Sequence, residues 1–347
     1  MATILDIVDP AALTAFVREV PQPANQILNR FLPDRTIGDI EAAFDRVTRV
    51  NRAAKFRTYD AETPIGQRDT LSRERVMLPP IGQKTVVGEY ERLKLEQLRT
   101  GGNATSALVN AIYDDAEVNT RAVRVRMELA RGDVLTDGAF TLTGENGLTL
   151  ETDWGVPTDN FVASAVPWSD TANATILADL RSWVQQYVEV NGERPAVMLT
   201  SEQVFSWMLL SEEIRQLAGS ILGTPSIVSE QQLQAVLTAH RMPTIVTYDS
   251  RFDVDGTFTR PIPDNLAILL PSDPSSLGYT AWGITAEALE LAGESNPSLD
   301  FSNAPGLVGV VLKEGDPVRT WTKVTGVGMP ILTDPNRLMV ADVESGS

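Results

Sequence analysis

The chain of 347 residues contains no cysteine and a single histidine, His240. The lack of cysteine excludes disulfides, thiolate metal sites and cysteine nucleophiles. A Ser-His-Asp mechanism would have only this one ring to use, and its position beside Arg241 predicts a helix end, where a histidine helps to satisfy terminal carbonyls. We therefore expect no catalytic residue, no metal and no cofactor.

Long apolar runs are also missing. No stretch of about 18 apolar residues occurs, so we expect no membrane span. The first twenty residues carry Asp6, Asp9 and Glu19 and lack the basic start and apolar block of a signal peptide. We expect the protein to begin in a cytoplasm. Hydrophobic residues still make up 43% of the chain, which is enough for the core of one large domain or two ordinary ones.

Positive charge is scarce over most of the chain, whose net charge is −17. Residues 132–300 hold 6 basic and 23 acidic side chains, whereas residues 35–100 hold 13 basic and 10 acidic ones. A protein that reads nucleic acid would present a basic face, so we do not expect sequence-specific DNA contact. An acidic surface suits the lining of a DNA container, and it equally suits ordinary solubility.

Motifs that carry chemistry are few. The sequence has no Gly-x-Ser-x-Gly elbow, no phosphate-binding loop and no dinucleotide fingerprint. Asp253–Gly256 resembles the start of a calcium loop but lacks the other acids that an EF-hand requires. The adjacent acids Glu212-Glu213 and Asp114-Asp115 leave open an acid and base pair. A soluble carboxylate-dependent hydrolase is therefore the alternative function of a different class.

Residues 1–45 are broken by prolines into short pieces, with a predicted helix over residues 11–20. Such a segment cannot bury its own apolar side chains, so we interpret it as an arm that packs on the rest of the chain or on a neighbour. Phe31 and Leu32 are its candidate inter-subunit contacts.

A long β-arm is predicted next, over residues 46–88, because two extended runs flank a Pro/Gly tip near Pro64 and Gly66. A two-stranded flap is marginally stable alone, so we expect it to lie on a partner subunit. Its basic residues are the remaining candidates for inter-subunit contact, through pairing with acidic surface on the neighbour. They are Arg46, Arg49, Arg52, Lys55, Arg57, Arg68, Arg73 and Arg75.

Residues 104–131 predict a long amphipathic helix that begins after Asn103 and ends at Gly132. Glu117 and Arg121 stand in the favoured i,i+4 order for an ion pair, and Arg124 with Glu128 stands in the weaker reverse order. The helix would be about 40 Å long. We interpret it as a spine. Its main apolar stripe consists of Leu108, Ile112, Ala116, Val123, Met127 and Ala130.

The rest of the chain mixes helices and strands, which predicts an α+β fold. A hairpin is expected around Asn146-Gly147, then a compact lobe, then a strand-rich C-terminus. The expected helices are 176–190, 201–210 and 230–240, and the expected strands are 139–143, 148–152, 195–200, 244–248, 306–312, 318–327 and 338–343.

The segment from Tyr248 to Leu266 predicts a β-hairpin. Alternating apolar and polar residues flank Asp255-Gly256, a dipeptide that accepts the positive φ angles of a type I′ turn. Pro261 and Pro263 then end the second strand. The apolar run 266–270 predicts a buried strand.

This hairpin, closed by Pro-Asp-Asn and followed by a core strand, resembles the major capsid proteins of the phage lambda type, the "capsid E" family. The segments 315–320, 328–335 and 135–144 are also similar, and Ile27–Pro33 matches in character. The resemblance implies an HK97-like capsid fold. It divides the chain into an N-terminal arm (1–45), an extended loop (46–88), a peripheral domain with the spine helix 104–131 (89–182), an axial domain (183–300) and returning peripheral strands (301–347).

The function that the resemblance implies is that of a non-enzymatic major capsid protein. Hexamers and pentamers would form the icosahedral head of a tailed phage around double-stranded DNA, after assembly in the host bacterial cytoplasm. Portal, scaffolding and decoration proteins are expected partners, and a membrane is not. An encapsulin-like nanocompartment shell is the nearest alternative.

Overall fold

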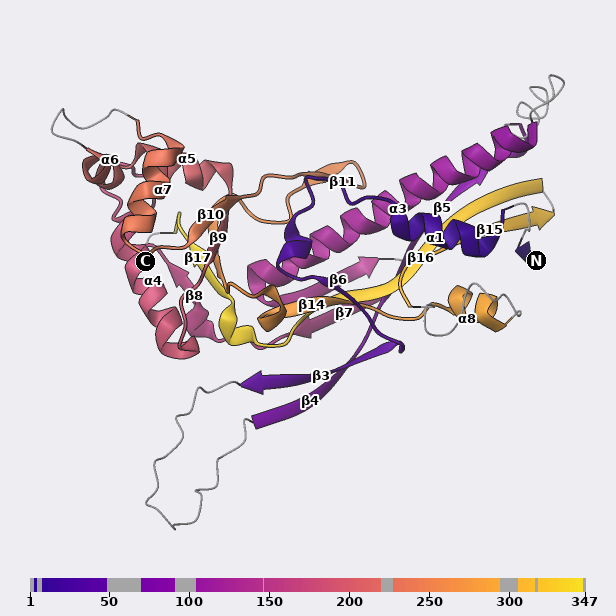
Figure 1. The fold of residues 1–347 in the computed structure, drawn as a ribbon, viewed down its shortest axis with the longest axis horizontal. Helices are drawn as coiled ribbons and strands as arrows, with labels where there is room; N and C mark the ends of the chain where they lie inside the picture. The colour runs from indigo at the N-terminus through magenta and orange to yellow at the C-terminus, as the bar shows by residue number, and fades with distance from the viewer. Residues whose placement is uncertain are drawn as a thin grey trace, which may run out of the picture.

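The protein is elongated, with two β-sheets joined side by side and one hairpin that projects from the body (Figure 1). This computed structural model describes residues 3–4, 8–48, 70–90, 104–145, 147–219, 227–293, 305–315 and 318–345. Within these ranges, no helix combines the length and apolar character needed to cross a membrane.

The larger sheet has six strands, three from residues 3–87 and three from residues 278–332. Its order is β1-β15-β16-β14-β2, and β5 pairs with the other edge of the 15-residue strand β16. All pairs are antiparallel except β14 with β2. The strands are β1 (Thr3–Ile4), β2 (Asp34–Thr36), β5 (Pro80–Val87), β14 (Gly278–Trp282), β15 (Val308–Gly315) and β16 (Val318–Leu332).

The long helix α3 (Ala104–Asp137) packs against β16 and β5, and the short helix α1 (Pro10–Glu19) packs beside it on β15. Four members of the predicted apolar stripe, Ile112, Ala116, Val123 and Met127, are buried as expected, and Ala130 is half-buried. The side chain of the sixth, Leu108, lies outside the described residues. The predicted end at Gly132 is wrong. The helix continues to Asp137, and Gly138, at φ +73°, follows it. Gly132 serves a close approach, because a Cβ there would lie 2.4 Å from the Pro261 carbonyl oxygen.

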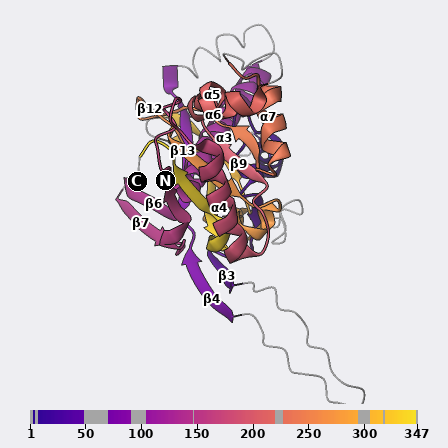
Figure 2. The same ribbon diagram turned by 90° about the vertical axis from the view of Figure 1, so that its left-hand side faces the viewer.

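The second sheet forms a lobe together with four helices. Figure 2 shows this lobe from its own side of the molecule. Its order is β10-β9-β13-β17-β8. The strands are β8 (Phe161–Ala163), β9 (Val197–Thr200), β10 (Thr244–Thr247), β13 (Leu266–Leu270) and β17 (Met339–Asp342). The helices are α4 (Ile176–Asn191), α5 (Glu202–Leu210), α6 (Glu212–Ala218) and α7 (Glu230–Ala239). The expected helices and strands of this region are therefore confirmed, apart from shifts of one to two residues at their ends.

The buried strand β13 separates two hydrophobic cores. Ala267 and Leu269 face the core beneath the four helices. Leu266, Ile268 and Leu270 face the opposite core, which also contains Leu28, Leu32 and residues of β14 and β16. Because successive side chains of a strand point to opposite faces, a strand buried on both faces has a continuous apolar sequence.

Three two-stranded hairpins complete the fold. The hairpin expected around Asn146-Gly147 is present as β6–β7, with Gly147 at φ +83°, while Asn146 itself lies outside the described residues. The hairpin β11–β12 confirms the turn expected at Asp255-Gly256. Asp255 and Gly256 have φ angles of +52° and +86°. The third hairpin is β3–β4. The bounds are β3 (Glu41–Thr48), β4 (Thr70–Met77), β6 (Ala139–Glu145), β7 (Leu148–Asp153), β11 (Phe252–Val254) and β12 (Thr257–Thr259), with α8 (Ala286–Gly293) and 3₁₀ turns η1 (Leu28–Arg30), η3 (Thr158–Asn160), η4 (Pro274–Ser276) and η5 (Pro335–Arg337).

The five-segment division of the chain stays a prediction, and the strands cross its boundaries. β14 lies within the range expected for the axial domain but pairs in the six-stranded sheet. β17 lies within the range expected for the peripheral strands but pairs in the lobe. The end of the expected loop, residues 80–87, is β5 of the six-stranded sheet.

Candidate assembly surfaces and the polar junction

The hairpin β3–β4 extends away from the body, and its strands pair only with each other among the described strands (Figure 1). At its base, the apolar side chains of Ile40 and Met77 are 55% and 67% exposed. The Arg75 Nη1 atom lies 4.0 Å from Glu41 Oε2 across the strands, and both side chains face solvent. The hairpin therefore presents apolar and charged surface that its own chain leaves uncovered.

The structure brings three of the predicted basic contacts onto this hairpin. Arg46 belongs to β3, and Arg73 and Arg75 belong to β4. Arg46 pairs in register with Ser72, and Arg73 pairs with Asp45. The other five basic candidates, Arg49, Arg52, Lys55, Arg57 and Arg68, fall outside the described residues. Contact of these side chains with another subunit stays a prediction.

The N-terminal arm packs on its own chain. Phe31 is 7% exposed and Leu32 is fully buried, and both belong to the core that the two sheets share. The physical reason is that β2 adds to the edge of the six-stranded sheet and draws the preceding residues over β14. Intramolecular packing therefore accounts for the burial of Phe31 and Leu32 in the single chain, and a contact of either side chain with another subunit stays a prediction.

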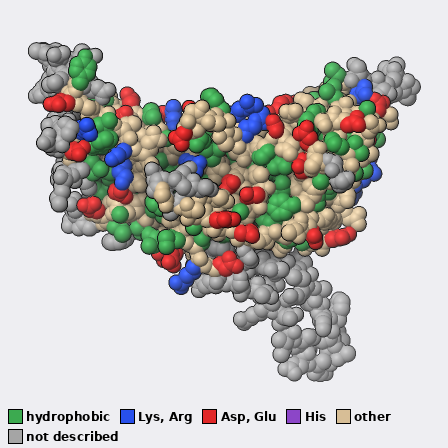
Figure 3. All heavy atoms as spheres, turned by 180° about the vertical axis from the view of Figure 1, so that it is seen from behind, with side chains coloured by type: hydrophobic (Ala, Val, Ile, Leu, Met, Phe, Trp, Pro, Cys, Tyr) green, Lys and Arg blue, Asp and Glu red, His purple; other side chains and the backbone are tan. Residues whose placement is uncertain are grey.

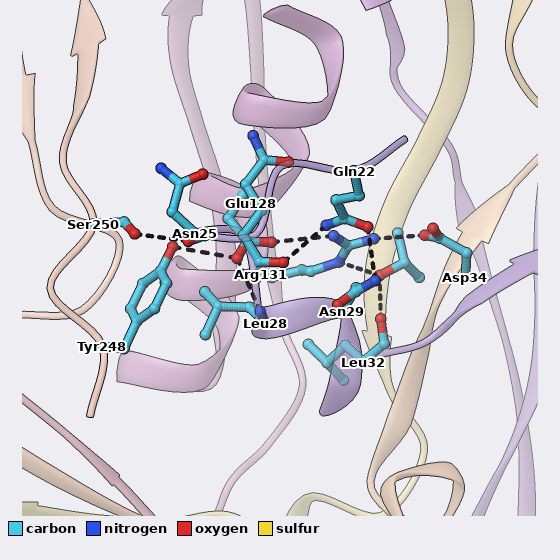
Figure 4. Close-up of polar contacts among 12 residues, drawn as sticks. Gln22, Asn25, Leu28, Asn29, Leu32, Asp34, Glu128, Arg131, Tyr248 and Ser250 are labelled. Carbon is cyan, nitrogen blue, oxygen red and sulfur yellow. Dashed lines mark hydrogen bonds and ion pairs between the residues drawn. The ribbon is translucent and has the colours of Figure 1, made fainter. Parts of the chain in front are cut away.

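A cluster of polar groups, buried except for the half-exposed Asp34, lies where the arm, the spine helix and the lobe meet, and Figure 4 draws it in close-up. We call it the polar junction; its side chains are Asp34, Glu128, Arg131, Tyr248 and Thr280. Glu128 is fully buried. Its Oε1 accepts hydrogen bonds from the Leu28 amide at 2.8 Å and from the Tyr248 hydroxyl at 3.2 Å. One carboxylate thus holds an arm segment and a lobe segment to the helix.

Arg131 lies one turn further along α3 and is 2% exposed. Its guanidinium donates to Glu128 Oε2 at 3.2 Å, to Thr280 Oγ1 at 2.9 Å and to Asp34 Oδ1 at 2.5 Å. Trp282 Nε1 donates to the same Asp34 oxygen at 2.8 Å. The fork geometry of arginine allows one side chain to bind three acceptors on three elements.

Burial controls the titration of the junction. It raises the pKa of the Glu128 carboxyl above its ordinary value, because the Leu28 amide, the Arg131 charge and the Tyr248 hydroxyl offset the desolvation only in part. Burial and the neighbouring Glu128 carboxylate also raise the pKa of Tyr248, which therefore stays a donor. A buried ion pair of this kind contributes little net stability, so we infer that it mainly fixes how the three segments meet.

Sequence reasoning missed the junction. It paired Glu128 with Arg124, but Arg124 instead donates to the carbonyl oxygens of Val20 and Arg18, at the end of α1. A signal was present, since Arg131 follows Met127 by one turn on the buried stripe. A charge in that position requires a buried partner. The predicted pair of Glu117 with Arg121 is confirmed.

The same reasoning applies to a gap in the stripe between Ala116 and Val123, where Asn119 and Thr120 are both fully buried. Asn119 Nδ2 donates to Thr85 Oγ1 at 3.1 Å and to the Thr322 carbonyl at 3.0 Å. This amide joins α3 to β16 and to β5, the strand that follows the projecting hairpin in the chain.

The Pro-Asp-Asn motif after the β11–β12 hairpin connects segments of the lobe through hydrogen bonds. Asn265 Nδ2 donates to Asp342 Oδ1 at 3.0 Å, and the Asn265 carbonyl accepts from the Val343 amide at 3.0 Å. The Asp264 carbonyl accepts from the Ser201 hydroxyl at 2.6 Å. Asp253 Oδ1 accepts from the Gly256 amide at 2.7 Å, which is a turn contact.

His240, Glu212 and Glu213, three of the candidate chemical residues, each contact a different structural partner and not one another. His240 ends α7, as expected, and its Nδ1 lies 3.0 Å from Arg181 Nη2. Glu213 accepts from the Leu177 amide at the start of α4, and Glu212 pairs with Arg215. Among the described residues, no cluster of histidine and carboxylate side chains is suited to hold a metal ion.

Comparisons with known proteins extend this picture. A family model described as phage major capsid protein E matches residues 9–343. The putative capsid protein of a prophage of E. coli CFT073 is similar in structure, with a TM-score of 0.63, 16% identity and 99% of each chain covered. A phage-related protein from Bordetella bronchiseptica RB50 has a TM-score of 0.57, 12% identity and 97% of each chain covered. Curated protein sequences give no match.

At such identities the structural likeness establishes the fold, and the fold is that of HK97-like capsid proteins, as the sequence predicted. The family model adds the evolutionary assignment. It spans the arm, the projecting hairpin, the spine helix and both sheets. This chain belongs to the phage major capsid protein E family.

Proposed function

We propose that this protein builds the icosahedral head shell of a tailed phage and encloses its double-stranded DNA. Copies assemble as hexamers and pentamers in the host bacterial cytoplasm, carry out no chemical reaction and remain in the virion as its shell. Portal, scaffolding and decoration proteins are the further partners. Membership of the capsid family and the HK97-like fold support this proposal.

The observation that carries the proposal is the β3–β4 hairpin. A two-stranded hairpin without a third strand is marginally stable in water. Here the hairpin has an exposed apolar base at Ile40 and Met77 and pairs with no further described strand. A second copy of the chain would supply the surface that it lacks, and that contact repeated around a closed assembly gives a shell.

The charge of the surface supports packaging of DNA without recognition of its sequence. The face drawn in Figure 3 carries acidic side chains spread among apolar and basic ones, and no basic strip runs across it. The net charge of −17 repels phosphate. The shell would therefore confine the DNA without binding it tightly.

The experiment shortens the hairpin. Ala43 and Arg75 lie directly opposite each other, so residues 44–74 are replaced by Asn-Gly, which closes two antiparallel strands with a type I′ turn. Buried Ala42 and Leu78 are retained. We expect the intact protein to form shells by negative-stain electron microscopy, and the shortened variant to keep its thermal midpoint but to form none.

Shells of normal yield from the shortened variant would contradict the role of the hairpin, and an intact protein that stays monomeric at high concentration would contradict the proposed function. Particles isolated from the native host distinguish the two kinds of shell. DNA inside the particles would support the phage head. An enzyme inside them would support the encapsulin-like shell and contradict the phage head.

A further inference from the structure

An exposed group of basic side chains lies at one end of the acidic lobe. Residues 132–300 contain 6 basic side chains against 23 acidic ones. Arg181, Arg194 and Arg241 are three of the six, and they gather around His240. Arg181 Nη2 lies 3.0 Å from His240 Nδ1, and Arg194 Nη1 donates to the Arg241 carbonyl oxygen at 3.2 Å. We call these four residues the basic cluster.

The basic cluster has no acidic partner among the described residues. By contrast, Arg215 and Arg260 of the same lobe each form an ion pair, with Glu212 and Asp249. The three arginines of the cluster are exposed, and their contacts with His240 and with the Arg241 backbone bring three cationic residues to the same end of α7. In a lobe with an excess of carboxylates, like charges gathered without a counter-charge indicate a contact made outside the chain.

An apolar groove of about 310 Å³ ends at this cluster. It runs between α6 and α7 and is lined mainly by apolar side chains, with His240 at its end; the other lining residues are Leu217, Ala218, Gln232, Ala235, Val236 and Ala239. The Leu217 side chain is 44% exposed. An apolar groove beside positive charge suits a protein segment that offers an apolar side chain and a carboxylate together. A phosphate backbone would use the charge and leave the groove empty.

The other end of α7 carries such a segment. Ile227 is 61% exposed. Glu230 is the first residue of α7; its side chain is exposed and has no ion-pair partner among the described residues. The ten-residue helix separates this corner from the basic cluster by about 15 Å. The basic cluster with its groove and the Ile227–Glu230 corner therefore lie at opposite ends of α7. This arrangement allows a head-to-tail contact between copies of the chain.

We propose that the groove and basic cluster of one copy receive the Ile227–Glu230 corner of a neighbouring copy. Ile227 enters the apolar groove, and Glu230 pairs with Arg241 and Arg181. The contact is heterologous, so repetition closes a ring when its rotation divides a full turn. The inference rests on the proposed function, because it names the partner of the lobe within the assembled shell.

The test exchanges the charges. The variants are R181E/R241E, E230R and the combination of all three. R251E is the matched control, because Arg251 is exposed directly before β11 and does not line the groove. Sedimentation velocity measures the protein concentration at which half of the chain is assembled. Reversal of exposed pairs repeated around a ring should raise that concentration by about tenfold in R181E/R241E and in E230R. The combined variant should recover most of the loss.

I227D is the matching groove variant and should also weaken assembly, while R251E should not. Thermal melts of the unassembled subunits establish that each exposed substitution leaves the fold intact. If R181E/R241E assembles like the intact protein, the inference is wrong and the proposed function stands. Normal assembly combined with lost binding to a DNA fragment would assign the cluster to phosphate and overturn the inference. Failure of the intact protein to assemble would overturn both.

Discussion

At the scale of single residues, Arg131 joins elements that are far apart in the sequence. Its three hydrogen-bond partners are Glu128 on its own helix, Asp34 on β2 and Thr280 on β14. The neighbouring Glu128 adds the arm through Leu28 and the lobe through Tyr248. Because a buried charge without a partner is far less stable than a buried pair, each member depends on the other.

Arg131→Met should therefore destabilise the unassembled subunit by about 3–5 kcal/mol, because it leaves the Glu128 carboxylate buried without its counter-charge. The double variant E128Q/R131M should recover part of this loss. Its neutral amide oxygen still accepts from Leu28 and Tyr248. Urea unfolding measures both free energies, and a double variant no more stable than Arg131→Met would contradict this account.

The raised pKa of Glu128 gives a second prediction at this scale. The folded state holds the Glu128 proton more tightly than the unfolded state, where the pKa is about 4.5. The stability contributed by this group is therefore present at low pH and lost as the pH rises from about 4.5 through the folded pKa. The neutral glutamine of E128Q lacks this dependence.

The thermal midpoint of the intact subunit minus that of E128Q should accordingly fall as the pH rises from about 4.5 towards neutrality. The difference isolates Glu128, since the other titrating groups are common to both proteins. A difference that stays constant over this range would mean that folding does not raise the pKa of Glu128.

At the scale of elements, α3 depends on a glycine in its interior. Alanine forms helices better than glycine by about 1 kcal/mol, so intrinsic propensity alone would favour Gly132→Ala. The structure reverses the sign, because the added Cβ would lie 2.4 Å from the Pro261 carbonyl oxygen. The helix α3 and the segment around Pro261, which follows β12, would have to move apart.

We expect Gly132→Ala to destabilise the subunit by about 1–3 kcal/mol, the usual cost of overpacking. Gly38→Ala is the matched control, because its Cβ would meet no atom within 4 Å. Chemical denaturation compares the two. Equal stability of Gly132→Ala and the intact protein would show that Pro261 moves away at no cost.

At the scale of the whole molecule, the two sheets share one core. Ala281, Ile331 and Leu332 of the six-stranded sheet lie in the same cluster as Leu199 and Ile268 of the lobe. The chain also crosses between the sheets several times, since β17 completes the lobe from the far end of the sequence. Neither sheet can lose its structure without exposing apolar surface of the other.

The unassembled subunit should therefore unfold in one cooperative transition by differential scanning calorimetry, with equal calorimetric and van't Hoff enthalpies. Two resolved transitions would contradict the shared core. A fragment of residues 159–271, which lacks β17, should show no cooperative transition, because β13 and β8 would lose the strand between them.

Local sequence patterns were enough to predict the short-range elements of this protein. The two hairpin turns, the spine helix and the buried strand 266–270 could each be predicted from residues close together in the sequence. Turn geometry and amphipathic burial depend on short sequence separations. The partners of the buried charges and the packing of the arm residues, by contrast, could be seen only in the folded structure. Arg131 finds Asp34 and Thr280 across 97 and 149 residues, and Phe31 and Leu32 enter their own core. Such partners are set by how the sheets meet, which no local pattern encodes.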